Sequence, residues 1–195
     1  MIDTVPPGGH YSDTTISLGA DGAYDMTVGT AEFGNGTTTV HQQIAATALM
    51  TIPVKVRLRQ SDSDHGGHDT GAYGSTGTVI AGRATQLAAE ATREKILDFA
   101  GKYAGVPRRD CTLMADAVLC AGAPIALGDL HKAAQAEGVA LIATGTANGI
   151  PRSVAFNVQG FRVAVHPVSA EIRILKSVQA ADAGTVINPM QCRAQ

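Results

Sequence analysis

Residues 32–45 read EFGNGTTTVHQQIA, and here the sequence changes from the pattern of a strand to that of a helix. A hairpin is predicted before this stretch, because residues 13–18 and 23–30 are β-prone and flank an Asp-Gly turn signal. A helix is predicted over residues 37–49, since apolar side chains recur there every four positions. The stretch therefore predicts a β-to-helix junction whose bend is lined by glycine.

The remaining elements alternate between strand and helix without the regular rhythm of a doubly wound sheet. They comprise a half-exposed strand at 54–59, a long helix from Ser75 or Thr76 to Tyr103, a hairpin at 111–119, a helix at 127–137, and strands at 139–144, 153–165 and 171–178. This order predicts the α+β class, with a mainly antiparallel sheet and helices packed on one side. A possible subdivision of the chain is predicted near residues 107–110.

Composition excludes several classes of function. The chain has 195 residues with 15 basic and 17 acidic side chains, and a net charge of -2 gives no footprint for nucleic acid or anionic lipid. No apolar run is long enough to span a bilayer, and the first residues lack a leader pattern, so a cytoplasmic location is expected. Three cysteines without CxxC spacing indicate reduced thiols rather than a disulfide framework or zinc site.

A second glycine-rich stretch, SDSDHGGHDTGAYGSTGTVIAGRA, covers residues 61–84. His65 and His68 lie close to Asp62, Asp64 and Asp69, a set of side chains that suits a divalent metal ion. Glycines between the histidines leave these ligands unordered, however, and no second cluster completes the coordination. We therefore expect solvated loop histidines and predict no metal ligand.

Both glycine-rich bends open a helix, and this position suits an anion. Backbone N–H groups at the start of a helix lie at the positive end of its dipole, where a phosphate or other anionic oxygen binds. Residues 71–78, GAYGSTGT, lack the lysine of a Walker loop, and a capping loop without a ligand fits them equally well. Around Asn35, a plain turn capped by Thr37 or Thr38 is the alternative. His41, inside the following helix, is expected to be a surface or packed histidine rather than a general base.

Three stretches taken together carry a resemblance to a known family. EFGNGTTTV, SDSDHGGHDTGAYGSTGT and DAGTVINPMQCRAQ follow one another in the chain, the last covering residues 182–195. They resemble, in the same order, the GQGT segment, the DTD…DTGT-x-x-SR loop and the D-x-G-x-x-INP-x-x-x-x-GQ segment of the molybdenum subunit in the xanthine dehydrogenase/aldehyde oxidase family. The likeness covers residues 22–195.

The resemblance implies that residues 1–195 form part of a molybdopterin-binding domain in a molybdenum hydroxylase. Such enzymes oxidise an aldehyde or N-heterocycle with oxygen derived from water. The implied cofactor is molybdopterin cytosine dinucleotide with molybdenum, and iron–sulfur clusters and FAD are implied in other domains or subunits. The implied partners are the remainder of the molybdenum subunit and the iron–sulfur and flavin subunits or domains.

The resemblance also implies which residues contact the cofactor. Asn35 takes the position of the glutamine in GQG, and its shorter side chain is a departure from the family pattern. The implied cofactor-binding residues are Gly34, Asn35, Gly36, Gly71, Ala72, Tyr73, Gly74, Ser75, Thr76 and Gln195.

The family's general-base glutamate belongs to a GxGE segment that lies further along the chain than the INP motif. No catalytic residue is therefore assigned within these 195 residues, and the chain alone is expected to be inactive and to self-associate. The alternative from another class is a non-catalytic α+β domain that binds a phosphate-bearing ligand or a partner subunit.

Overall fold

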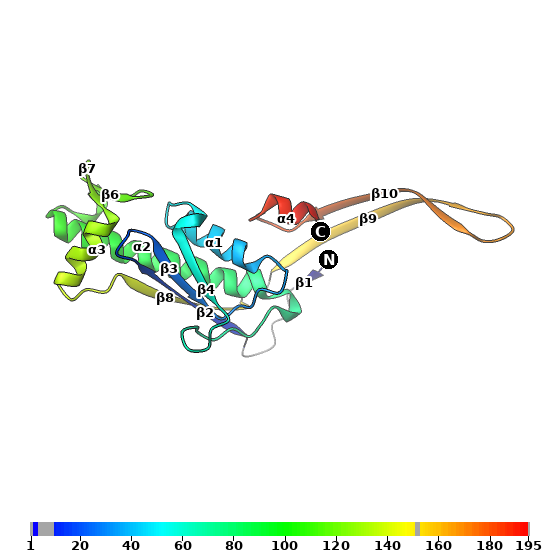
Figure 1. Ribbon diagram of the computed structural model, residues 1–195. Helices are drawn as coiled ribbons and strands as arrows, with labels where there is room; N and C mark the ends of the chain where they lie inside the picture. Colours follow the sequence, from blue (N-terminus) through cyan, green and yellow to red (C-terminus); the bar gives the residue numbers. More distant parts are fainter. Residues whose placement is uncertain (1, 4–9, 151–152, 195) are drawn as a thin grey trace.

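A computed structural model describes residues 2–3, 10–150 and 153–194 of the chain. It consists of a body built from residues 10–150 and a long two-stranded arm that extends from one end of the body (Figure 1). The mixture of helices with mainly antiparallel strands confirms the predicted α+β class.

The main sheet has four strands in the order β4-β3-β2-β8. The strands are β2 (Tyr11–Leu18), β3 (Tyr24–Val28), β4 (Val56–Gln60) and β8 (Ile142–Asn148). β2 pairs antiparallel with both β3 and β8, so the predicted hairpin is confirmed, whereas β4 runs parallel to β3. A 3-10 turn, η1 (Pro53–Lys55), precedes β4, so this strand begins two residues later than predicted.

Two helices cover one face of this sheet. α1 (Thr37–Ala48) packs against α2 (Arg83–Ala104), and α2 lies along β2 and β8. The start of the long helix differs from the prediction, because a 3-10 turn, η2 (Tyr73–Ser75), and a π-helical segment, η3 (Gly77–Gly82), precede α2. Ala88, Thr92, Ile96 and Phe99 of α2 are buried, whereas the side chain of Tyr103 is 52% exposed.

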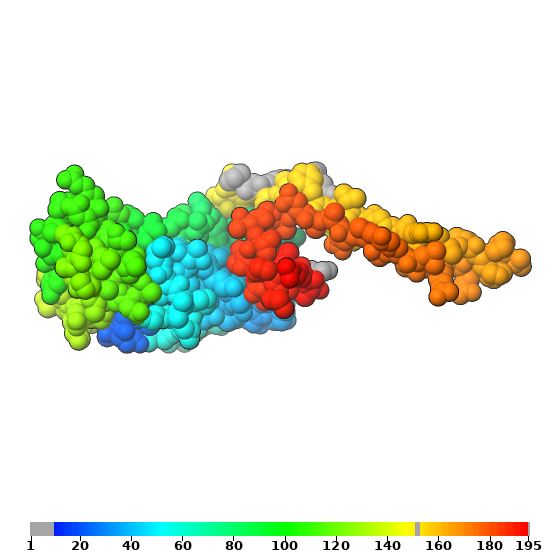
Figure 2. Space-filling model, turned by 90° about the horizontal axis from the view of Figure 1, so that it is seen from above, coloured from blue at the N-terminus to red at the C-terminus, as the bar shows by residue number. Residues whose placement is uncertain are grey.

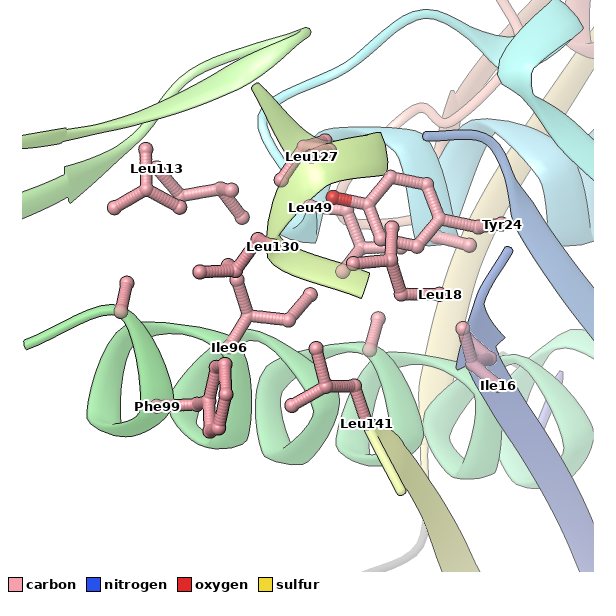
Figure 3. Packing of buried hydrophobic residues seen from close by; sticks show 14 of the residues in the cluster. Ile16, Leu18, Tyr24, Leu49, Ile96, Phe99, Leu113, Leu127, Leu130 and Leu141 are labelled. Atoms are coloured by element: carbon pink, nitrogen blue, oxygen red, sulfur yellow. The ribbon is translucent and has the colours of Figure 1, made fainter. Parts of the chain in front are cut away.

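A smaller layer closes the other end of the body. It contains η4 (Arg108–Asp110), β5 (Cys111–Leu113), β6 (Ala117–Cys120), β7 (Ala123–Ala126) and α3 (Leu127–Ala136). The hairpin and the helix were predicted here and β7 was not. One apolar cluster spans the sheet, α2 and this layer (Figure 3); its labelled members are Ile16, Leu18, Tyr24, Leu49, Ile96, Phe99, Leu113, Leu127, Leu130 and Leu141.

The arm is formed by β9 (Val154–Val165) and β10 (Ile172–Asp182), which pair antiparallel and end in the short helix α4 (Pro189–Ala194). β1 (Ile2–Asp3) adds a third strand beside the base of β9. In Figure 2 the arm extends from the body as a thin projection. Both strands were predicted, but β10 continues to Asp182 and almost every described arm side chain is exposed. Two strands without a second layer cannot bury their apolar side chains.

Candidate functional site

The bend before α1 is organised by a carboxylate that the sequence analysis had not singled out. Glu32 accepts hydrogen bonds from the backbone amides of Gly34 at 2.7 Å, Gly36 at 3.1 Å and Thr38 at 3.0 Å. The amides of Thr38 and Gly36 are the largest causes that lower the pKa of this carboxyl from 4.5 to about 2. Glu32 therefore already occupies the anionic position at the start of α1.

The third motif lies directly against this bend. Asn188 accepts hydrogen bonds through Oδ1 from the amides of Met190 and Gln191, both at 3.1 Å, and so caps the start of α4. Gln191 then covers Gly36: a Cβ placed on Gly36 would lie 2.8 Å from the Gln191 amide carbon. The first and third motifs thus meet, while Asn35 stays exposed between them. Gln195 lies outside the described residues.

The second loop is fixed to the sheet by Asp69. Its carboxylate accepts hydrogen bonds from Ser12 Oγ at 2.9 Å on β2 and from Thr30 Oγ1 at 2.8 Å just after β3. The other carboxylate oxygen accepts from the amide of Gly71 at 2.7 Å. The Asp69 carboxylate therefore links the start of the bend at 71–76 to β2 and to the segment that follows β3.

Residues 71–76, from Gly71 and Ala72 to Thr76, form a single tight bend. Backbone φ is +101° at Gly71, +68° at Gly74 and +60° at Ser75, so three of these residues have a positive φ. Thr76 is buried, and its hydroxyl lies 2.7 Å from the Tyr73 carbonyl oxygen and 3.0 Å from that of Gly71. Thr76 thus closes the bend instead of capping the helix as predicted. Tyr73 and Ser75 project to the surface.

The loop histidines have local partners. His65 Nδ1 lies 3.1 Å from Asp62 Oδ2, and the ring of His68 stacks on Tyr11 with centroids 4.1 Å apart. Among the residues that the structure describes, no group of three His, Cys, Asp or Glu side chains is arranged to hold a metal ion.

His41 belongs to a buried network between α1, α2 and the sheet. Its Nδ1 lies 2.7 Å from Thr85 Oγ1, which also contacts Thr14 Oγ1 at 3.1 Å and donates to the Ala81 carbonyl oxygen at 3.0 Å. The side chain is only 2% exposed, and burial lowers the pKa of His41 to about 4. The residue is a neutral packed histidine, one of the two alternatives predicted.

A groove of about 630 Å³ lies between α1, η3, α2 and the loop before α4. Gln43 Oε1 and Arg93 Nε are buried in its wall and form no hydrogen bond with any residue that the structure describes. Its lining side chains and loop residues include Gln43, Ile44, Thr78, Arg83, Gln86, Glu90, Arg93, Thr185, Val186 and Ile187.

The groove joins the helices that follow the first and second motifs to residues 185–187 of the third. The predicted site residues at 34–36 and 71–76 lie at the starts of these helices and not in the groove itself. α1 and α2 both begin at the end of the body from which the arm extends (Figure 1). Polar residues recur along one side of α2, at 83, 86, 90 and 93. This spacing is a sequence signal that could have indicated the groove.

Comparison with known proteins agrees with this arrangement. A family model described as molybdopterin cofactor-binding domain matches residues 3–195. The chain belongs to this family. The resemblance to molybdenum hydroxylases is thereby confirmed, and the family is one of molybdenum-dependent oxidoreductases.

Two curated relatives are much longer than this chain. The probable hypoxanthine oxidase XdhD of Escherichia coli K12 is 34% identical over 177 residues, which cover 89% of this chain and 18% of that protein. The gamma subunit of the 6-hydroxypseudooxynicotine dehydrogenase complex of Paenarthrobacter nicotinovorans is 26% identical over 196 residues, covering 96% of this chain and 25% of that subunit. The chain thus spans a quarter or less of these relatives.

Solved structures share the fold. CO dehydrogenase from Oligotropha carboxidovorans superimposes with a TM-score of 0.87 at 22% identity, covering 99% of this chain and 26% of that one. Quinoline 2-oxidoreductase from Pseudomonas putida 86 gives a TM-score of 0.84 at 23% identity, covering 96% of this chain and 25% of that one. Within the described parts of the present chain, no helix has both the length and the apolar character needed to cross a bilayer.

Proposed function

We propose that this chain forms part of the cofactor-binding wall of a molybdenum hydroxylase that oxidises an aldehyde or an N-heterocycle with oxygen from water. One observation carries the proposal. The groove of about 630 Å³ is bounded by the helices that begin at the first two motifs and by residues 185–187 of the third. Segments far apart in the sequence thus converge around one hollow, as expected for a bulky ligand.

The chemistry of the groove supports an anionic cofactor. Arg83 and Arg93 bring two positive charges to a lining that also contains the carboxylate of Glu90. Gln43 Oε1 and Arg93 Nε are buried without a hydrogen bond to the described residues, although Arg93 Nε lies 3.7 Å from Glu94 Oε1. Buried polar atoms in this condition are costly unless a ligand or water completes their hydrogen bonding. The pyrophosphate and amide-bearing rings of molybdopterin cytosine dinucleotide supply suitable acceptors and donors.

The resemblance assigns contact with this cofactor to residues at the mouths of the two helices. Because Glu32 already binds the amides of the first bend, we propose that the exposed side chain of Asn35 makes the contact there. The proposed contact residues are Gly34, Asn35, Gly36, Gly71, Ala72, Tyr73, Gly74, Ser75, Thr76 and Gln195. When bound, the cofactor supplies the oxidation chemistry, and the chain holds and orients it.

The arm supports the proposal that further protein completes the enzyme. Val158, Val163 and Ile174 are 71%, 48% and 62% exposed, and they belong to a ribbon with many apolar residues. We propose that the remainder of the molybdenum subunit covers this ribbon, that iron–sulfur and flavin subunits or domains carry electrons away, and that the enzyme is cytoplasmic. The 195 residues alone would then be inactive and self-associate. A clean monomer in sedimentation at high concentration would contradict the self-association.

The test is to express the complete reading frame together with a molybdenum-cofactor maturation system. Metal analysis should find molybdenum, and a panel of aldehydes and N-heterocycles should contain an oxidised substrate. Asn35→Ala should lower molybdenum occupancy, whereas Gln135→Ala, at an exposed position of α3 far from the arm (Figure 1), should not.

Absence of molybdenum from the matured wild-type protein would reject the enzyme proposal. Binding of cytidine diphosphate by such a metal-free protein would instead support the alternative, a non-catalytic domain for a phosphate-bearing ligand. Arg83 and Arg93 in the groove are the observation that favours this alternative.

A further inference from the structure

Two cysteines face each other across the small sheet at the end of the body distant from the arm. Cys111 on β5 lies directly opposite Cys120 on β6 in the antiparallel register. The amide of Met114 donates to Ala117, and the amide of Ala121 donates to Asp110. Hydrogen-bonded pairs alternate with non-hydrogen-bonded ones, so the cysteines occupy a non-hydrogen-bonded pair, where facing side chains approach most closely.

Both thiols lie on the buried face of the sheet and belong to the main apolar cluster. Cys111 is 7% exposed and Cys120 is 3% exposed, and their Sγ atoms lie 2.8 Å apart. Facing positions in such a pair have the Cα separation that a disulfide requires, so closing one needs little backbone movement. The third cysteine, Cys192 on α4, is exposed and serves as an internal reference.

We propose that Cys111 and Cys120 form an oxidisable dithiol site, which a peroxide converts into a disulfide that staples β5 to β6. The first thiol is oxidised by hydrogen peroxide to a sulfenic acid with release of one water. The second thiol displaces the hydroxyl as a second water, so two thiols and one peroxide give one disulfide and two waters. The inference is independent of the groove and of the proposed molybdenum chemistry.

The Cys120 thiol is protonated at neutral pH. Burial, followed by the neighbouring Cys111, raises the pKa of the Cys120 thiol to about 12. Because the thiolate is the reactive form, this thiol reacts slowly, and the site closes under sustained peroxide rather than at trace levels.

The test begins with the complete wild-type protein. After peroxide treatment, remaining thiols are alkylated in denaturant, and the protein is cut with a proteinase that cleaves before aspartate. Cleavage before Asp110, Asp116 and Asp129 separates 110–115, which contains Cys111, from 116–128, which contains Cys120. The expected product is the two peptides joined, lighter than their sum by two hydrogen atoms and separated by dithiothreitol.

Cys120→Ser should abolish the joined product, and Cys192→Ser should leave it unchanged. Recovery of 110–115 and 116–128 as separate alkylated peptides, under conditions that oxidise Cys192, would overturn the proposal. Conversion of either buried cysteine to its sulfinic acid without any joined product would overturn it as well.

Discussion

The stability of this domain should fall in mild acid because of one side chain, His41. Its imidazole is 2% exposed and hydrogen-bonded to Thr85 between two helices and the sheet. The folded protein holds it neutral with a pKa of about 4, whereas the unfolded chain takes up a proton near the ordinary value of 6.5. Between these values the unfolded state binds more protons, so the free energy of unfolding decreases as the pH falls through that window.

The size of the effect follows from the two pKa values. Each unit of difference corresponds to about 1.4 kcal/mol, so the full shift is worth about 3 kcal/mol, lost between pH 6.5 and pH 4. At pH 5, still above the usual carboxylate range, about 2 kcal/mol is already lost. For a domain of this size that lowers the melting temperature by about 4–8 °C relative to pH 7.

The assay is urea unfolding of wild type and His41→Gln from pH 7 to pH 5. Glutamine keeps a neutral hydrogen-bonding side chain toward Thr85 but cannot take up a proton. The variant should be less stable than wild type at pH 7, and its free energy of unfolding should fall much less on acidification. Equal pH dependence in both proteins, with unfolding slopes unchanged, would refute the assignment of the effect to His41.

Three further outcomes are expected. Gly145→Ala places a methyl group against the backbone of α2, including the Leu87 carbonyl carbon at 2.9 Å, and should cost about 1–3 kcal/mol in urea unfolding, whereas Gly160→Ala on the open arm should be nearly neutral. Glu32→Gln should destabilise the protein at neutral pH and reduce the stability loss that wild type shows below pH 4.5, since the folded pKa of Glu32 is about 2; acid titration by circular dichroism checks this. Gly36 has φ +78° and lies against Gln191, so Gly36→Ala should lower the melting temperature. Adding Gln191→Ala to this variant removes the steric contact but not the backbone strain, and should restore only part of the loss.

Much of the fold could be predicted because its elements follow simple periodicities. The β2–β3 hairpin has an Asp-Gly turn, and α1 repeats apolar residues every four positions. β8 was misplaced by three residues, since its alternation of buried and exposed positions runs through small residues such as Gly145 and Ala147. The last strand was predicted too short because its Gln and Ala residues carry little β signal.

The predicted start of the long helix was wrong for a different reason. Thr76 has the identity of a capping residue, but its hydroxyl is committed to two carbonyl oxygens of the preceding bend. The helix then passes through a π-helical segment before becoming regular at Arg83. Propensity describes one residue at a time, and it cannot show that a tight bend upstream will take the only hydroxyl proton.

The candidate site shows the same limit in its electrostatics. Glycines at a helix start predict free amides for an anion, and this inference is sound only if no carboxylate of the chain reaches them first. Glu32 lies two residues before Gly34, close enough to curl back onto the amides of its own bend. An external anion at that position would have to displace a carboxylate held by three amides, and the like charges would repel. Under the proposed function, the bend acts as a support that projects the neutral amide of Asn35. We propose that a charged group of the cofactor lies toward Arg83 and Arg93, which outnumber the single carboxylate of Glu90 in the groove lining.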